Sequence, residues 1–294
     1  MKPMIEKIEG LIAAPFAVFS GDGSLAPEKV PAYADFLKSQ GVAGVFVNGS
    51  TGEFASLTVP ERLQLAECWA ATAAPDFRVM IHVGHTCLSE SRRMAAHARD
   101  LGVGGCATLA PFFFKPTDVD ALVAWCAAIA AEAPDLPFFY YHIPDLSGVL
   151  MPMLTFLEKA APRIPNLAGI KFTHDDLNDF QRCVEFDSGR LNILFGRDQL
   201  LLDALLRGAV GAVGTTYNYA APLYLEMIDL FRAGNLEAAR RLQMQAADMI
   251  ASIISRECGM AAFKTVMREE GFDCGPPRLP LRNPVGRQPS VAGA

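Results

Sequence analysis

The runs Phe138-Phe-Tyr-Tyr-His-Ile143 and Leu167-Ala-Gly-Ile-Lys-Phe172 decide the fold class of this 294-residue chain. Both are nearly continuous in apolar side chains and do not alternate cleanly between apolar and polar residues. Such runs are typical of strands buried on both faces, as in a parallel sheet that is covered by helices. A longer helical pattern separates the two runs, which together predict a β/α/β unit.

Six further runs of this kind occur along the chain. They are Gly10–Pro15, Gly44–Asn48, Val79–Gly84, Cys106–Ala110, Asn192–Gly196 and Val210–Gly214. Helical patterns alternate with the runs, the connections are short, and no linker divides the series. Eight β/α units over roughly 200 residues predict a single (β/α)8 TIM barrel rather than two doubly wound domains.

Helix boundaries are indicated at two places within the barrel. Thr58-Val-Pro-Glu61 has the form of a capping box, with a proline in the tolerated first turn. Thr117 with Asp120 is a weaker version of the same signal. Both signals predict a helix that starts shortly after a strand.

Residues that follow the eighth run extend beyond the eight units. Residues 221–270 have a helical pattern that Gly234 interrupts, and the proline-rich residues 276–294 are predicted to run irregularly over the surface. We therefore expect residues 1–220 to form the barrel. Residues 221–294 would form a helical extension and tail packed on it, within one structural unit.

Composition excludes several classes of protein. The chain is 51% hydrophobic with a net charge of -6, which argues against disorder. Nucleic acid is not an expected partner, since 26 Lys+Arg face 32 Asp+Glu and no basic run occurs. A membrane span is not expected, because no apolar run reaches about 18 residues. The N-terminal segment, residues 1–10, carries two Glu and two Lys and is unlike a signal peptide. The seven cysteines are scattered and include no CxxC motif, which favours a reducing, cytoplasmic location.

In a barrel of this kind, chemistry belongs at the C-terminal ends of the strands. Polar side chains with catalytic potential follow or end several of the predicted strands. They are Gly49-Ser50-Thr51-Gly52-Glu53, Tyr141, Lys171, Thr173, Asp198 and Thr215-Thr216. This agreement between position and chemical type predicts an active site at that end of the barrel.

Lys171 is the only one of the eight lysines that lies inside an apolar strand-like run. A buried ammonium loses hydration, so its pKa falls, by up to ~3–5 units when burial is complete. The neutral amine can then attack a ketone and form a Schiff base. A structural lysine that pairs with a core carboxylate or snorkels to the surface is the alternative, and the residue pattern leaves both open.

Tyr141 and the loop around Ser50 are weaker candidates by themselves. Tyr140 and Tyr141 point to opposite faces of a strand, so only one of them can face the barrel interior. A phenol near an amine could relay protons, although core packing is the common role of such a tyrosine. The turn Gly49–Gly52 could hold an anion with N–H groups and hydroxyls. It lacks the pattern G-x-S-x-G, which disfavours a serine hydrolase.

Four segments, taken together, indicate a family. They are Asn-Gly-Ser-Thr-Gly-Glu (48–53), Tyr-His-Ile-Pro (141–144), Gly-Ile-Lys-Phe-Thr (169–173) and Gly-Thr-Thr-Tyr-Asn-Tyr (214–219). In order and spacing the chain resembles the N-acetylneuraminate lyase/dihydrodipicolinate synthase family of pyruvate-handling class I aldolases over roughly residues 8–282. Further segments at 110–113, 195–198 and 275–281 are similar to the lyase branch of the family, especially its animal type.

The resemblance implies a role for each candidate residue. Lys171 would form an imine with the C2 carbonyl of pyruvate or of an open-chain sialic acid. Tyr141 would relay protons near the C4 oxygen, while Ser50 and Thr51 would hold the substrate carboxylate. The residues implied to contact the sugar half are Thr173, Gly196, Asp198, Gln199 and Thr215. Neither a metal nor an organic cofactor is implied, because the lysine itself is the electron sink.

The resemblance also implies an activity and an assembly. The expected reaction is the reversible cleavage of N-acetylneuraminate to N-acetylmannosamine and pyruvate by a cytoplasmic homotetramer. Leu146 stands where synthases of the family look for an arginine that binds a second carboxylate, so the synthase activity is disfavoured. Gln199 replaces the second acid of a pair that is usual in the lyases. Phe113 replaces a tyrosine that many relatives donate across a subunit boundary.

Two other functions remain open at this level. A pyruvate aldolase or dehydratase for another 2-keto-3-deoxy sugar acid is one, and Gln199 is its main support. A binding or regulatory relative without turnover is the other, and the joint presence of Lys171, Tyr141 and Ser50 argues against it.

Overall fold

The computed structural model describes residues 5–256 and 258–282 and has a closed barrel at its centre. Eight parallel strands follow one another in sequence order, and the first pairs with the last. The strands are β1 (Gly10–Ala13), β2 (Gly44–Val47), β3 (Arg78–His82), β4 (Gly105–Leu109), β5 (Phe138–His142), β6 (Leu167–Phe172), β7 (Asn192–Phe195) and β8 (Gly211–Gly214). The predicted (β/α)8 barrel is confirmed, with strand ends that differ from the predicted ones by at most two residues.

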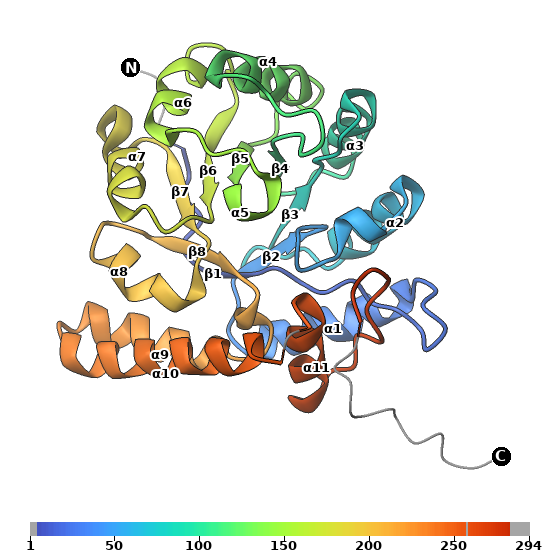
Figure 1. Cartoon of the computed structure of the whole chain (residues 1–294), viewed down its shortest axis with the longest axis vertical. Coiled ribbons are helices and arrows are strands. Elements are labelled where there is room, and N and C mark those ends of the chain that lie inside the picture. The colour runs from blue at the N-terminus through green and yellow to red at the C-terminus, as the bar shows by residue number, and fades with distance from the viewer. Residues whose placement is uncertain (1–4, 257, 283–294) are drawn as a thin grey trace.

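Helices surround the strands (Figure 1). Those of the β/α units are α1 (Val30–Ser39), α2 (Val59–Ala70), α3 (Leu88–Asp100), α4 (Val119–Ala130), α5 (Pro144–Ser147), α6 (Met153–Ala160), α7 (Leu177–Gly189) and α8 (Leu201–Leu205). Those after β8 are α9 (Ala221–Arg232), α10 (Leu236–Ile254) and α11 (Met260–Glu269). Single-turn helices are η1 (Pro27–Lys29), η2 (Phe54–Ser56), η3 (Asp198–Leu200) and η4 (Thr216–Asn218). The helices α9 and α10 lie side by side along the barrel, and the predicted break at Gly234 separates them.

Both predicted helix starts are confirmed, but the capping residue expected at the second one is wrong. At α2 the Thr58 hydroxyl accepts from the Glu61 N–H, and the Glu61 carboxylate accepts from the Thr58 N–H at 2.8 Å, as in a capping box. At α4 the N-cap is Asp118, whose carboxylate accepts from the Ala121 N–H at 2.8 Å. An ionised carboxylate both caps the free N–H groups and complements the helix dipole, which favours Asp118 over Thr117 at this position.

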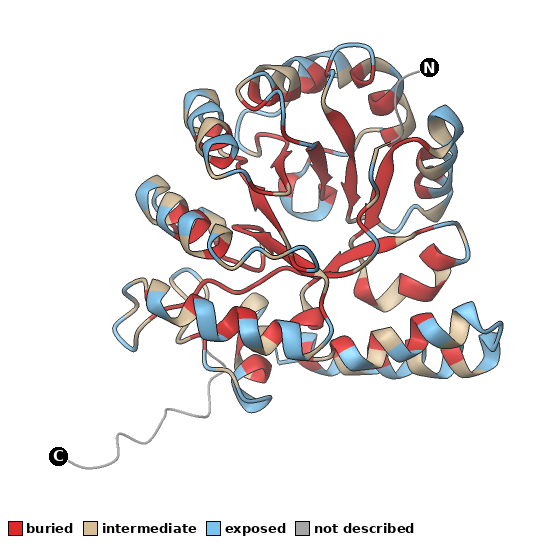
Figure 2. Ribbon diagram, turned by 180° about the vertical axis from the view of Figure 1, so that it is seen from behind, coloured by how far each residue is buried: buried red, intermediate tan, exposed pale blue. Residues whose placement is uncertain are grey.

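The core has two layers, one inside the barrel of strands and one between the strands and the helices. Nearly all strand residues are buried, while the helices expose their outer faces (Figure 2). Phe46, Tyr141 and Leu194 belong to the smaller cluster inside the barrel. Tyr140 belongs to the larger cluster between strands and helices, where its ring centroid lies 4.7 Å from that of Phe156 on α6. Tyr141, and not Tyr140, therefore faces the barrel interior.

The described residues include all seven cysteines, and each carries a free thiol. Burial raises the pKa of the Cys106 thiol to about 12, so this thiol stays protonated at neutral pH. Within the described ranges, no helix combines the length and the hydropathy that crossing a bilayer requires.

Candidate active site

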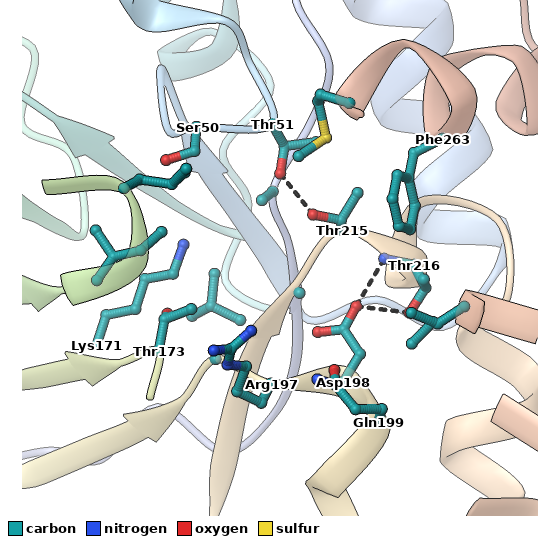
Figure 3. Close-up of a pocket in the computed structure, with 18 of the residues that line it drawn as sticks. Ser50, Thr51, Lys171, Thr173, Arg197, Asp198, Gln199, Thr215, Thr216 and Phe263 are labelled. Atoms are coloured by element: carbon teal, nitrogen blue, oxygen red, sulfur yellow. Dashed lines mark hydrogen bonds between the residues drawn. The ribbon is translucent and has the colours of Figure 1, made fainter. Parts of the chain in front are cut away.

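A pocket of about 740 Å³, open to solvent, lies at the carboxyl ends of the strands (Figure 3). Its lining comes from the ends of six strands or the loops that follow them, and from helices α5, α10 and α11. Nine of the residues that the sequence predicts for the site line it, whereas the neighbouring Gly49, Gly52 and Glu53 do not. The nine are Ser50, Thr51, Tyr141, Lys171, Thr173, Gly196, Asp198, Gln199 and Thr215. Residues up to 165 positions apart are thus brought to one place, while their individual roles remain predictions.

Lys171 is held inside the barrel by the register of β6. It pairs with Tyr141 of β5 on one side and with Leu194 of β7 on the other. Its Nζ lies 3.9 Å from the ring centroid of Phe46 and 4.1 Å from that of Tyr141, and the side chain makes no ion pair with any described residue. Burial lowers the pKa of Lys171 to about 7, although the charge of Asp198 acts in the opposite direction. A large part of this amine is therefore uncharged near neutral pH, unlike a structural lysine paired with a core acid.

Hydroxyl groups gather on the side of the pocket next to β2. The Ser50 hydroxyl lies 3.4 Å from the Tyr141 hydroxyl, and the Thr51 and Thr215 hydroxyls are 2.7 Å apart. Burial raises the pKa of Tyr141 to about 12, while its contact with Ser50 lowers it. The phenol therefore stays protonated at neutral pH and can both donate and accept a proton in a relay with Ser50.

The loop that carries Ser50 and Thr51 is held at both ends. Asn48 and Glu53 adopt left-handed backbone angles, with φ of 59° and 52°, which are uncommon for residues other than glycine. Asn48 donates from Nδ2 to the Arg62 carbonyl at 3.0 Å, and its own carbonyl accepts from His82 Nδ1 at 2.7 Å. Burial lowers the pKa of His82 well below its usual range, so the ring remains a neutral donor. These contacts keep the two hydroxyls directed toward the pocket.

A buried ion pair joins the other end of this loop to the C-terminal helices. Lys264 of α11 donates to the Glu53 carboxylate at 2.9 Å, and both side chains are buried. The second oxygen of Glu53 accepts from the Arg278 N–H at 2.9 Å. Sequence analysis placed Glu53 among the pocket candidates, but the structure turns it away from the pocket and into this contact.

The Glu53→Gln variant is expected to lose about 3–5 kcal/mol of unfolding free energy, because it leaves the Lys264 ammonium buried without a counter-charge. Chemical denaturation of the variant measures the loss. Glu237→Gln is the matched control, since its ion pair with Arg241 is exposed and should contribute nothing measurable. A Glu53→Gln variant as stable as the control would contradict this account of the pair.

Asp198 is a buried carboxylate at the opposite side of the pocket. It accepts from the Thr216 N–H at 2.8 Å and from the Thr216 hydroxyl at 2.6 Å, and the Tyr224 hydroxyl lies 2.8 Å from that same oxygen of Thr216. Burial raises the pKa of Asp198, and the two Thr216 hydrogen bonds oppose this rise. A Cβ at position 214 would lie 2.2 Å from Asp198 Oδ1, so Gly214 is needed for this arrangement.

Thr173 and Gly196 form a compact corner between Lys171 and Asp198. The Thr173 Oγ1 is buried and makes no hydrogen bond of regular geometry with a described residue, although its contact with Tyr141 lowers the pKa of that phenol. A Cβ at Gly196 would lie 2.0 Å from that oxygen. The corner therefore places a hydroxyl beside a position where only glycine fits, and a polar ligand atom could form a hydrogen bond with this hydroxyl.

The histidines do not build a metal centre. Within residues 5–256 and 258–282, no group of three or more His, Cys, Asp or Glu residues is placed to hold a metal ion. His82 is used to hold Asn48, and His85 Nδ1 accepts from the Cys87 N–H at 2.9 Å.

Sequence analysis missed two sets of pocket residues. Arg197 lines the pocket between Gly196 and Asp198, and its place in the segment 195–198 was the available signal. The residues contributed by the helices after β8 are Ile250, Ile254, Met260 and Phe263. Their apolar side chains had no signal that distinguished them from core residues, because their contact with the pocket is tertiary.

A closed β/α barrel with a desolvated, unpaired lysine at the carboxyl ends of its strands defines an enzyme of the class I aldolase type, a lyase. The model of the dihydrodipicolinate synthetase family matches residues 7–288, and the chain belongs to this family.

The similarity to known lyases covers nearly the whole chain. The chain is 41% identical to the N-acetylneuraminate lyase of Rattus norvegicus over 281 residues, which are 94% of this chain and 88% of the rat protein. Its structure is similar to that of the Proteus mirabilis N-acetylneuraminate lyase, with a TM-score of 0.91, 39% identity and coverage of 95% and 94% of the two chains. The structure of a catalytic lysine mutant of the Ruminococcus gnavus sialic acid aldolase is also similar, with a TM-score of 0.86 and 30% identity. The match covers 94% of this chain and 90% of the aldolase chain.

Proposed function

We propose that this protein cleaves N-acetylneuraminate reversibly to N-acetylmannosamine and pyruvate. The observation that carries the proposal is the Lys171 amine, which is buried between two aromatic rings, makes no ion pair with a described residue and has its pKa lowered to about 7. The names of the relatives from Rattus norvegicus and Proteus mirabilis support the substrate, and the relative named for a catalytic lysine supports the covalent route.

The Lys171 amine would add to the C2 carbonyl of the open-chain sugar acid and expel water as the imine forms. The C4 hydroxyl then loses its proton and the C3–C4 bond breaks, so that the bonding electrons flow into the imine and leave an enamine. N-acetylmannosamine departs as the aldehyde. The enamine takes a proton at C3, and water hydrolyses the resulting pyruvate imine to regenerate the free amine.

Neighbouring groups would orient the substrate and move the protons. Tyr141, as a neutral phenol 3.4 Å from Ser50, would relay the proton of the C4 hydroxyl. The hydroxyls of Ser50 and Thr51 would hold the substrate carboxylate by hydrogen bonds. The groups proposed to contact the sugar half are Thr173, Gly196, Asp198, Gln199 and Thr215.

A second substrate class has specific support at one position. Gln199 lines the pocket as a neutral amide where the lyase branch usually has an acid, which would suit another 2-keto-3-deoxy sugar acid. The synthase activity is less well supported, because Leu146 of α5 lines the pocket where a guanidinium would be required, and its side chain is exposed.

We also propose that the enzyme is a cytoplasmic homotetramer. Phe113 and Phe114, in the loop after β4, are 75% and 86% exposed, and such a pair of aromatic side chains favours a subunit contact. The seven free thiols favour a reducing compartment.

Borohydride reduction in the presence of pyruvate, followed by peptide mapping, tests the covalent route. We expect a stable pyruvate adduct on Lys171 and on no other lysine. A panel of sugar acids tests the substrate: N-acetylneuraminate should have the highest kcat/KM. If it is among the poorest substrates of the panel, the proposed substrate is wrong even when the adduct forms.

Imine formation should depend on pH through the amine of Lys171. Only the neutral amine attacks, so at limiting pyruvate the trapping rate should rise about tenfold per pH unit below 7 and level off above it. A lysine with the ordinary value of 10.5 would have a deprotonated fraction about 1600-fold smaller at pH 7. Trapping rates from pH 5 to pH 9 measure the midpoint, and a rate still rising at pH 9 would contradict the lowered pKa.

A further inference from the structure

Arg197 lies at the rim of the pocket and connects three consecutive loops of the barrel. Its Nη2 donates to Asp145 of α5, and its Nε lies 2.8 Å from Asp175 Oδ1, in the loop between β6 and α7. Its side chain is 23% exposed, whereas those of Asp145 and Asp175 are 56% and 61% exposed. In the view of Figure 3 the guanidinium lies between Thr173 and Asp198, on the side of the pocket proposed for the sugar.

Most of the donors of this guanidinium make no hydrogen bond with a described residue. Arginine carries five N–H donors, yet within the described residues the side chain of Arg197 makes one hydrogen bond, and its buried Nε contacts Asp175 as an ion pair without a hydrogen bond. Arg278 gives the contrast: its side chain donates to two carbonyls and to both oxygens of Glu61. The Nη1 of Arg197 makes no hydrogen bond with any described residue, so it has capacity to donate to a ligand.

The charges around Arg197 limit what that ligand can be. The carboxylates of Asp145 and Asp175 more than balance the single positive charge of the guanidinium, and Asp198 lines the same pocket. An anionic group on the sugar would therefore be repelled by the net negative charge of these side chains. A neutral carbonyl or hydroxyl oxygen could accept from Nη1 without that penalty.

We propose that Arg197 determines specificity by donating to neutral acceptor oxygens on the sugar half, and that the surrounding carboxylates select against anionic sugars. The inference rests on the proposed function and extends it to the substrate class. Pyruvate lacks the sugar half, so binding of pyruvate at Lys171 does not involve Arg197.

The test compares Arg197→Met with Asp175→Asn, a variant that removes the rim contact but keeps the guanidinium. We expect Arg197→Met to raise KM for N-acetylneuraminate by about 10- to 100-fold, the range for a lost hydrogen bond to a charged donor. Reductive trapping of pyruvate, which lacks the sugar half, should proceed as in the parent. Asp175→Asn should leave KM within about threefold of the parent, well below the loss expected for such a hydrogen bond.

Three results would overturn the inference. The first is an unchanged KM in Arg197→Met. The second is an equal rise of KM in Asp175→Asn, which would mean that Arg197 only holds the loops together. The third is a parent enzyme that prefers N-acetylmannosamine 6-phosphate to N-acetylmannosamine in the condensation with pyruvate. Each is separable from failure of the proposed function, because that failure would appear in the parent enzyme as a missing pyruvate adduct or as poor cleavage of N-acetylneuraminate.

Discussion

The Lys171→Arg variant is expected to form no pyruvate adduct and to lose turnover by roughly 10⁴-fold or more, the scale on which the removal of a covalent nucleophile acts. Arginine keeps the positive charge but remains protonated in proteins, so it has no free lone pair with which to attack a carbonyl. The parent amine differs because burial between Phe46 and Tyr141 lowers its pKa to about 7. Borohydride trapping with mass mapping and steady-state cleavage of N-acetylneuraminate are the two measurements.

A charged guanidinium inside the barrel could also disturb the fold, so a second variant is needed. Lys171→Met keeps an unbranched, apolar side chain that suits this interior, and it should fold and lack the adduct. Lys264→Arg is the matched control: Lys264 is also buried, but it is held by Glu53, and its substitution should preserve the adduct at Lys171. Appreciable turnover in a folded Lys171→Met variant would disprove the covalent mechanism.

The second large effect is expected from Tyr141→Phe, which should lower kcat by roughly 10²–10⁴-fold, the usual range for loss of a general acid–base group. The change removes a hydroxyl that lies 3.4 Å from Ser50 and keeps the ring that packs against Phe46 and Lys171. Pyruvate should still be trapped with a half-saturation close to that of the parent. Turnover of N-acetylneuraminate and the concentration dependence of trapping separate these two effects.

The adjacent tyrosine is a control with the same substitution on the other face of the strand. Tyr140 is just as buried, but its ring packs against Phe156 of α6 and does not line the pocket. Tyr140→Phe should therefore keep kcat near that of the parent. Equal losses in the two variants would mean that Tyr141 acts through packing and not through its hydroxyl.

The fold was predictable because burial leaves a direct mark on the sequence. A strand covered on both faces needs apolar side chains at nearly every position, so β5 and β6 read as continuous runs, and six others do the same. Helix starts were less certain. The reciprocal bonds of Thr58 and Glu61 were visible from their spacing, whereas Asp118 displaced the expected cap at Thr117. The division of the chain at residue 220 stays a prediction.

The site was predictable as a set of positions, because polar residues at the ends of parallel strands converge at one end of a barrel. The sequence did not predict which residues of a strand face the barrel interior. Spacing could say that Tyr140 and Tyr141 face opposite ways, and only the register that pairs Tyr141 with Lys171 decided between them. Glu53 shows the limit of the positional argument, since it sits in the predicted loop but binds Lys264.

By itself the sequence determined the barrel, the end of it where the pocket lies and the lysine that stands out in an apolar strand, because these depend on local pattern and strand order. Only the tertiary structure decided that, among residues 5–256 and 258–282, Lys171 has aromatic neighbours and no paired acid, α11 holds the Ser50 loop, and the Nη1 of Arg197 at the rim makes no hydrogen bond. The physical reason is that pKa, ion pairing and hydrogen-bond capacity depend on groups a few ångströms away in space. Those groups come from strands and helices that are distant along the chain.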